Sequence, residues 1–152
     1  MDVSDVMAAI AERLRALPDV TVYYPAPNAI AASPAIVVMD GNSEGPSVYE
    51  RTFGGQEVAA RITVRILVKS HRDRPREATR IDRLVPQVLD ALDPAGTGVA
   101  NDLLPGLPDH LDRIWDRATV VRGSTEEYAG EYCYAADIGL DPLFTRTPQE
   151  IV

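Results

Sequence analysis

The sequence predicts an α+β domain in which two long helices pack on one face of a mixed, mainly antiparallel β-sheet. Two segments have apolar residues three and four positions apart, which is the spacing of a buried helix face. Between and after these segments, runs of β-branched residues are separated by glycine and proline, as in strands joined by turns. The predicted order is α-β-β-β-α-β-β, which gives a domain of packed layers around one core.

The size and charge of the chain limit its expected partners. With 152 residues, 45% of them hydrophobic, the chain has the length and composition of one folded domain. We expect this domain over residues 1–142 and a loose C-terminal tail over residues 143–152. The net charge of −8 disfavours nucleic acid and anionic lipid as general partners. No apolar run approaches the roughly 20 residues that span a bilayer, so no membrane partner is expected.

The first helix is predicted to end before Pro18, which cannot continue it. Asp2 or Ser4 can cap its start, and Asp5 suits the positive N-terminal end of the helix. Its apolar stripe consists of Val3, Val6, Met7, Ile10, Leu14 and Leu17.

Two strands are predicted to follow this helix, over residues 20–24 and 35–39. The second is apolar at almost every position, which indicates an interior strand buried on both faces. Residues 40–47 then collect Gly41, Gly45 and Pro46 among polar residues, which is typical of an exposed loop.

The clearest strand signal covers residues 58–69, where apolar residues occupy the even positions. The odd positions carry Arg61, Thr63, Arg65 and Lys69, so this face is expected to be solvated. Gly54-Gly55 indicates a bend or bulge before this strand, with residues 48–53 as a strand on the far side. We expect residues 41–57 to form a projecting arm.

The second long helix is predicted over residues 75–92, with Pro86 expected to kink it or to force an irregular turn. Its apolar face consists of Ile81, Leu84, Val85, Val88, Leu89 and Leu92. Residues 93–108 are rich in glycine and proline and are interpreted as a connector. Two final strands are predicted over 114–122 and 127–140, joined by a turn at Gly123-Ser124-Thr125.

No catalytic, cofactor-binding or metal-binding residues are predicted. An enzyme would need Cys133 paired with His71 or His110 and a carboxylate such as Asp73 or Asp109, yet no motif brings these together. Cys133 lies in a strand-like segment and is interpreted as a small buried hydrophobic residue. His71 with Asp73, and Asp109-His110 with Asp112, are interpreted as solvated loop residues rather than metal ligands.

Two surface features are candidates for binding partners. Val48, Tyr49 and Phe53 are apolar residues of the arm with no evident place in the core, and together with Arg51 they form the predicted subunit or tube interface. Arg61, Arg65 and Lys69 form a basic row along one strand face. This row is either an ordinary solvated face or a surface for an acidic partner or for DNA in a channel.

Several stretches of this sequence resemble the small tail terminator proteins, which are tail completion or neck proteins of long-tailed phages, particularly those of actinobacterial hosts. The similarity is carried by Tyr24-Pro25-Ala26-Pro27, by 48–55 (VYERTFGG), by the alternating strand after it, and by Asp73-Arg74 leading to 80–84 (RIDRL). It continues through Trp115 and the strand pair over 119–140, so it covers nearly the whole chain in order.

The resemblance implies a structural virion protein and not an enzyme. Such proteins form a ring, usually a hexamer, at the head-proximal end of the tail tube. The ring binds the tail tube protein, stops polymerisation, and meets the head-completion or stopper protein, while DNA only passes through its lumen. It would be assembled in the host cytoplasm and reside in the tail neck, without a cofactor. A head-to-tail stopper or tail completion protein, or a small-molecule binding domain, remains the alternative.

Overall fold

A computed structural model of the chain describes residues 2–30, 33–52, 55–69, 74–92, 111–113, 119–128 and 131–146. The helices in this part of the chain are α1 (Val3–Leu14) and α2 (Arg74–Leu92). The strands are β1 (Thr21–Tyr23), β2 (Ala35–Asp40), β3 (Val48–Thr52), β4 (Gly55–Ala59), β5 (Ile62–Lys69), β6 (Leu111–Arg113), β7 (Thr119–Tyr128), β8 (Glu131–Leu140) and β9 (Leu143–Arg146).

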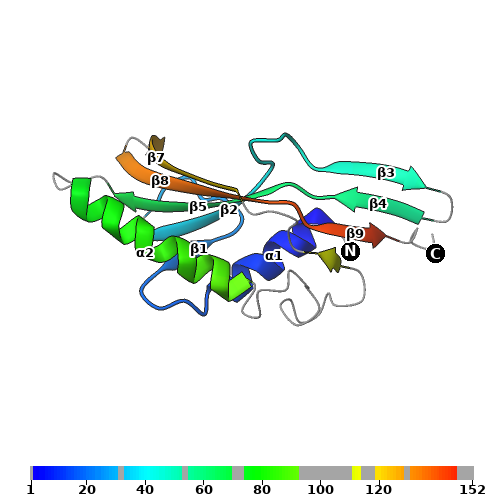
Figure 1. Cartoon of the computed structure of the whole chain (residues 1–152), viewed down its shortest axis with the longest axis horizontal. Coiled ribbons are helices and arrows are strands. Elements are labelled where there is room, and N and C mark those ends of the chain that lie inside the picture. The colour runs from blue at the N-terminus through cyan, green and yellow to red at the C-terminus, as the bar shows by residue number, and fades with distance from the viewer. Residues whose placement is uncertain are drawn as a thin grey trace.

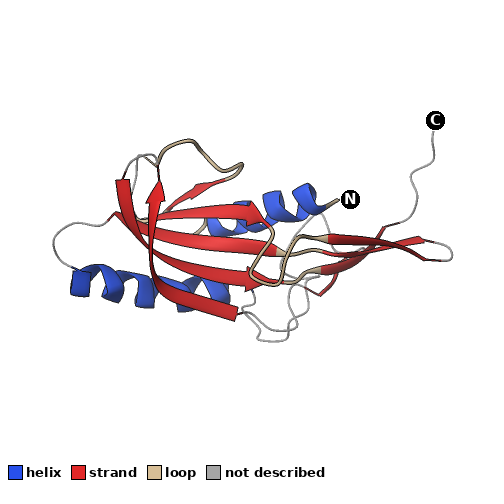
Figure 2. Ribbon diagram, turned by 90° about the horizontal axis from the view of Figure 1, so that it is seen from above, coloured by secondary structure: helices blue, strands red, loops and turns tan. Residues whose placement is uncertain are grey.

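The strands form two sheets, and the fold is α+β as predicted. The main sheet has the order β1-β2-β5-β8-β7, in which β1 is parallel to β2 and the other neighbours are antiparallel. Both helices lie on the same side of the main sheet (Figure 1). A second sheet, β3-β4-β9-β6, extends beyond the helices at one end of the molecule (Figures 1 and 2). We call it the projecting sheet. No helix in the described ranges is long and apolar enough to cross a bilayer.

Helix α1 begins with a capping box. The Asp5 backbone N–H donates to Asp2 Oδ1 at 3.0 Å, and the Asp2 N–H donates to Asp5 Oδ2 at 2.8 Å. These bonds satisfy backbone donors that the helix itself leaves unpaired. The hydrogen bond from the Asp5 N–H holds the pKa of the Asp2 carboxyl below its usual value of 3.8.

We expect Asp2→Ala to lower the free energy of unfolding by about 1 kcal/mol at neutral pH, because it removes the cap acceptor. Asp2→Asn keeps an acceptor and should lose less. Because the folded-state pKa is depressed, the ionised cap stabilises the protein above pH 4 and loses this contribution as the pH falls through the folded-state value. Urea titrations of both variants between pH 2 and 7 test this, and an acid-side slope unchanged in Asp2→Asn would contradict it.

Helix α2 continues through Pro86 as one helix, so the irregular turn, one of the two outcomes expected at this proline, does not form. Pro86 is on the exposed side of the helix, while Ile81, Leu84, Val88 and Leu92 are buried against the sheet. Packing of this apolar face holds the helix together despite the hydrogen bond that proline removes. At its C-terminal end, Arg13 Nε of α1 donates to the carbonyl oxygen of Ala91 at 2.9 Å and so joins the two helices.

Strand β5 is buried in part on both faces, which corrects the expectation that its odd face is solvated. Even-numbered residues of β5 do face the helices, as predicted, but Thr63 and Leu67 on the other face are also buried. That face carries a second apolar cluster, made of Ile30, Ala35, Val37, Leu67, Cys133 and Ala135. Ile30 belongs to the segment between β1 and β2. This segment therefore covers part of the sheet face that the alternation of polar and apolar residues along β5 predicts to be exposed to solvent.

The turn between the last two long strands lies later than predicted. Strand β7 runs through Gly123 to Tyr128, and Tyr128 pairs with Glu131, so the chain reverses between these two residues. The register shifts between Arg122 and Ser124, which makes the glycine a β-bulge within the strand rather than a turn. Glycine followed by polar residues fits either structure, so the sequence could not separate them.

The predicted C-terminal tail begins too early, since residues 143–146 form strand β9. This strand pairs with β4 and β6 at the centre of the projecting sheet, and Phe144 is fully buried. Only Asp141-Pro142 separates β9 from β8, just as Ala60-Arg61 separates β4 from β5. Two neighbouring strands of the main sheet therefore lead directly into two neighbouring strands of the projecting sheet.

Candidate assembly surface on the projecting sheet

The projecting sheet has an inner and an outer face, which differ in their contacts. Residues directly opposite each other in an antiparallel sheet lie on the same face. The register places Tyr49, Val58 and Phe144 in one row, and Val58 and Phe144 belong to the core that includes α1. This is the inner face. The neighbouring row consists of Val48, Ala59 and Leu143, and together with Glu50, Glu57 and Thr145 it forms the outer face.

Strand β3 is the edge of the projecting sheet and is exposed on both faces. It pairs with β4 on one side only, so its other backbone edge has no strand partner among the described residues. Val48 is 38% exposed and Tyr49 43% exposed, the two large hydrophobic side chains that are most open to solvent in the described chain. An edge strand with apolar side chains is a common site of pairing with another chain.

Of the predicted interface residues, Val48, Tyr49 and Arg51 are therefore exposed on this edge strand. Phe53 lies outside the described residues. Tyr49 also has a role within the chain, because its hydroxyl accepts a hydrogen bond of 3.3 Å from the backbone N–H of Val3. The edge strand is thus tied to the first turn of α1. Sequence spacing gave no sign of this contact, since the two residues are 46 positions apart.

The outer face carries an unfavourable charge arrangement. Glu50 and Glu57 are directly opposite each other on β3 and β4, and both are exposed. Neither side chain forms an ion pair with another described residue. Like charges directly opposite across two strands destabilise the sheet, so a positively charged partner on this face would relieve the repulsion.

The loop that leads into the projecting sheet is held by Arg61, one member of the predicted basic row. The Arg61 guanidinium donates to the Glu44 carbonyl oxygen at 2.6 Å, and its backbone N–H donates to Ser47 Oγ at 2.9 Å. Its carbonyl accepts from the Gly41 N–H at 2.6 Å. Gly41 has φ +85°, a left-handed conformation that favours glycine. Arg61 therefore fixes the base of the projecting sheet.

Arg65, the second member of the predicted row, forms a bidentate ion pair within the main sheet. Arg65 Nε and Nη2 donate to the two carboxylate oxygens of Asp137 at 2.7 and 2.9 Å, directly across β5 and β8. Both side chains are largely buried. Lys69 ends the strand, where its backbone N–H donates to Ser33 Oγ at 3.0 Å. Arg65 and Lys69 share a face of β5, but Arg61 precedes the strand and holds the loop at its start, so the predicted row of three on one strand face is wrong.

Because Arg65 is paired with Asp137, its replacement by glutamate is expected to destabilise the fold. Arg65→Glu places a carboxylate opposite Asp137, and we expect it to lower the free energy of unfolding by about 2 kcal/mol. The double exchange Arg65→Asp with Asp137→Arg restores opposite charges and should recover most of the loss. Chemical denaturation of the two variants and of the original protein tests this. Equal stability of the single and double variants would contradict it.

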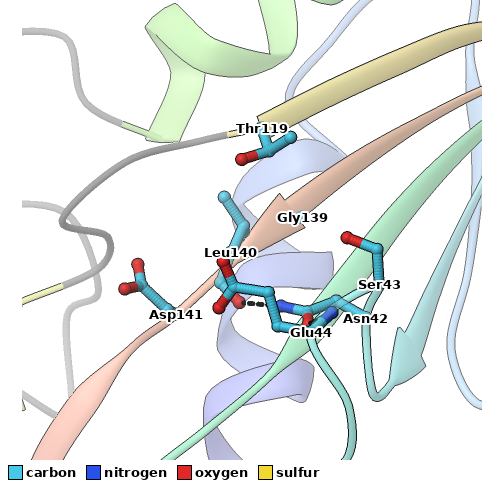
Figure 3. A pocket seen from close by; sticks show the side chains of 7 residues that line it. All are labelled: Asn42, Ser43, Glu44, Thr119, Gly139, Leu140 and Asp141. Carbon is cyan, nitrogen blue, oxygen red and sulfur yellow. Dashed lines mark hydrogen bonds between the residues drawn. The ribbon is translucent and has the colours of Figure 1, made fainter.

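A polar cavity of about 500 Å³ lies where the main sheet meets the projecting sheet (Figure 3). It is lined by Asn42, Ser43, Glu44, Thr119, Gly139, Leu140 and Asp141. Asn42 organises one wall, since its Nδ2 donates to the Leu140 carbonyl at 3.0 Å and its Oδ1 accepts from the Glu44 N–H at 2.9 Å. The charged residues of the lining are the acids Glu44 and Asp141, so the cavity suits a cationic or hydrogen-bonding group.

Cys133 is fully buried in β8, in the apolar cluster on the face away from the helices. A nucleophilic thiol needs access to its substrate, which this position denies. His71, Asp73, Asp109 and His110 lie outside the described residues. Within the described chain, no group of three or more histidine, cysteine, aspartate or glutamate residues is arranged to hold a metal ion.

We expect Cys133→Ser to lower the free energy of unfolding by about 1–2 kcal/mol, because it puts a hydroxyl into an apolar cluster. Self-association at a temperature where the variant is folded should equal that of the original protein. Cys133→Ala, which buries no hydroxyl, is the matched control. Light scattering and thermal denaturation give the two readouts, and lost association at unchanged stability would assign the thiol a functional role.

No protein-family model matches this sequence, and no curated protein shows significant similarity to it. The function is therefore inferred from the fold and from the chemistry of its surfaces.

Proposed function

We propose that this protein is a structural virion protein of a long-tailed phage, the ring that ends the tail tube at its head-proximal end and joins the tail to the head connector. The observation that carries the proposal is the projecting sheet, which presents the exposed edge strand β3 beyond the helices (Figure 2). A sheet built to contact another chain is what a ring subunit requires, and the resemblance of the sequence to tail terminators supplies the biological setting.

Two further properties support an assembly role. The projecting sheet is anchored by continuous strands and by buried Phe144, so it holds a defined position from which to meet a partner. The charge of −8 gives the chain little general attraction for DNA, which suits a ring through which DNA passes without binding. On this proposal the partners are further copies of the chain, the tail tube protein and the head-completion protein.

The proposal is tested by assembly with the tube protein. Purified protein should form rings, detected by size-exclusion chromatography with light scattering, and should bind the ends of tube polymers in electron micrographs. Tube protein polymerised with it should give shorter tubes, each closed by a ring at one end. A monomer that leaves tube length unchanged would contradict the proposal.

The alternative function in the same phage virion is that of a head-to-tail stopper or tail completion protein of the neck. The same micrographs separate the two, because a stopper should bind the head connector and leave tube length unaffected.

A small-molecule binding domain is favoured by one observation, the polar cavity of about 500 Å³ next to Asn42. Thermal denaturation with small cationic compounds tests it, and a raised midpoint that is absent in Asn42→Ala would support that function.

A further inference from the structure

The outer face of the projecting sheet combines apolar and acidic rows. Val48, Ala59 and Leu143 form an apolar row across three strands, and each is at least partly exposed. Beside them lie Glu50 and Glu57, whose repulsion nothing else in the described chain relieves. The face is therefore complementary to a surface that is apolar in one part and positively charged in the next.

A surface of that composition lies on the body of the same molecule. A cavity of about 210 Å³ is formed between the segment that follows α1, the start of β2 and the middle of α2. Pro18, Val20, Pro34 and Leu84 supply apolar lining, and Arg80, Arg83, Gln87 and Asp19 supply polar lining. Arg80 and Arg83 are exposed and form no ion pair with another described residue. We call this surface the α2 cavity.

Resting on the proposed function, we propose that the outer face of the projecting sheet of one copy docks on the α2 cavity of the next copy. Glu50 and Glu57 then meet Arg80 and Arg83, while the apolar row covers the proline-lined wall. The two complementary surfaces belong to the same chain, which favours a second copy as the partner.

The positions of the two surfaces decide the kind of assembly. The projecting sheet lies at one end of the long axis, whereas α2, whose middle lines the α2 cavity, runs along the body of the molecule (Figure 1). Contact between different surfaces on successive copies is head-to-tail, and it repeats until the copies close into a ring or extend as a filament. The inference thus names the contact that would close the ring.

Charge exchange tests this contact. One variant carries Glu50→Arg and Glu57→Arg, the other Arg80→Glu and Arg83→Glu, and each alone should weaken self-association at least tenfold. An equal mixture of the two should associate again, because each sheet then meets a complementary cavity. A chain with all four changes should associate as the original does. Light scattering at several salt concentrations provides the measurement.

The neutral variant Glu50→Gln with Glu57→Gln separates assembly from folding. It removes the repulsion within the sheet, so the monomer should become more stable while association weakens. If the original protein associates but the exchanges neither weaken nor rescue it, this inference is overturned and the proposed function stands. If the original protein is a monomer at all concentrations and also fails to cap tubes, both are overturned.

Discussion

Replacing Phe144 with alanine should lower the free energy of unfolding by about 3–5 kcal/mol, the largest loss that we expect from a single change in this protein. Phe144 is among the largest side chains with no exposed surface, and it lies at the centre of the projecting sheet between Val58 and β6. Its removal leaves a cavity where the sheet packs on the core that includes α1. Urea denaturation followed by circular dichroism measures the loss.

Thr145→Ala is the matched control, because Thr145 is the neighbouring residue on the same strand and is exposed. It should change the free energy of unfolding by less than about 0.5 kcal/mol. Truncation after Pro142 should be at least as harmful as Phe144→Ala, since it removes β9 entirely. A truncated protein of unchanged stability would restore the original expectation that residues 143–152 are a loose tail.

On the proposed function, replacing residues 48–52 with glycine and serine at the same length should abolish self-association while leaving a folded monomer. The change removes every side chain of the edge strand and weakens its strand propensity, but it keeps the loop that Arg61 holds. We expect the dissociation constant between copies to rise at least a hundredfold, because hot-spot side chains dominate such interfaces. Sedimentation or light scattering over a concentration series measures it.

The control for this replacement is Glu12→Ser with Arg15→Ser, which removes an exposed ion pair of α1 away from the projecting sheet. It should leave association unchanged. Loss of the Tyr49 bond to Val3 lowers stability slightly in the main variant, so association is compared at temperatures where both proteins are folded. Association of the glycine-serine variant at full strength would place the contact elsewhere on the molecule.

The sequence predicts the parts of this fold whose signals are local. The apolar stripe of α1 and the apolar run of β2 predict elements that form where expected, whereas the predicted strand over 58–69 is divided between β4 and β5. Gly54-Gly55 also indicates a bend after the predicted strand over 48–53, and β3 and β4 pair on either side of it. These signals depend on neighbouring residues, which sequence inspection compares directly.

The errors come from contacts between distant segments. Leu143–Arg146 carries only four residues of weak strand signal, and it becomes a strand because β4 and β6 pair with it. From the sequence alone, Arg65 is expected to be a solvated cation. In the structure β8 places Asp137 opposite Arg65, and the two side chains form an ion pair. From the sequence alone, Tyr49 is expected to be a surface residue without a contact to the core. In the structure its hydroxyl accepts a hydrogen bond from the backbone N–H of Val3 in α1. In each case the deciding partner lies on a strand or helix whose position the sequence does not state.

The two-residue connections Ala60-Arg61 and Asp141-Pro142 hold the projecting sheet rigidly to the main sheet. Ala60 and Pro142 are both buried in these connections, and the Ala60 N–H donates to the Pro142 carbonyl at 2.8 Å. Two adjacent strands that cross together, bonded to each other at the crossing, resist bending far more than a single linker would. A force applied at β3 would therefore be transmitted through the projecting sheet to β5 and β8, the strands that contact α2. In a ring of such subunits, the diameter would be set by this stiffness and not by the length of a flexible connection.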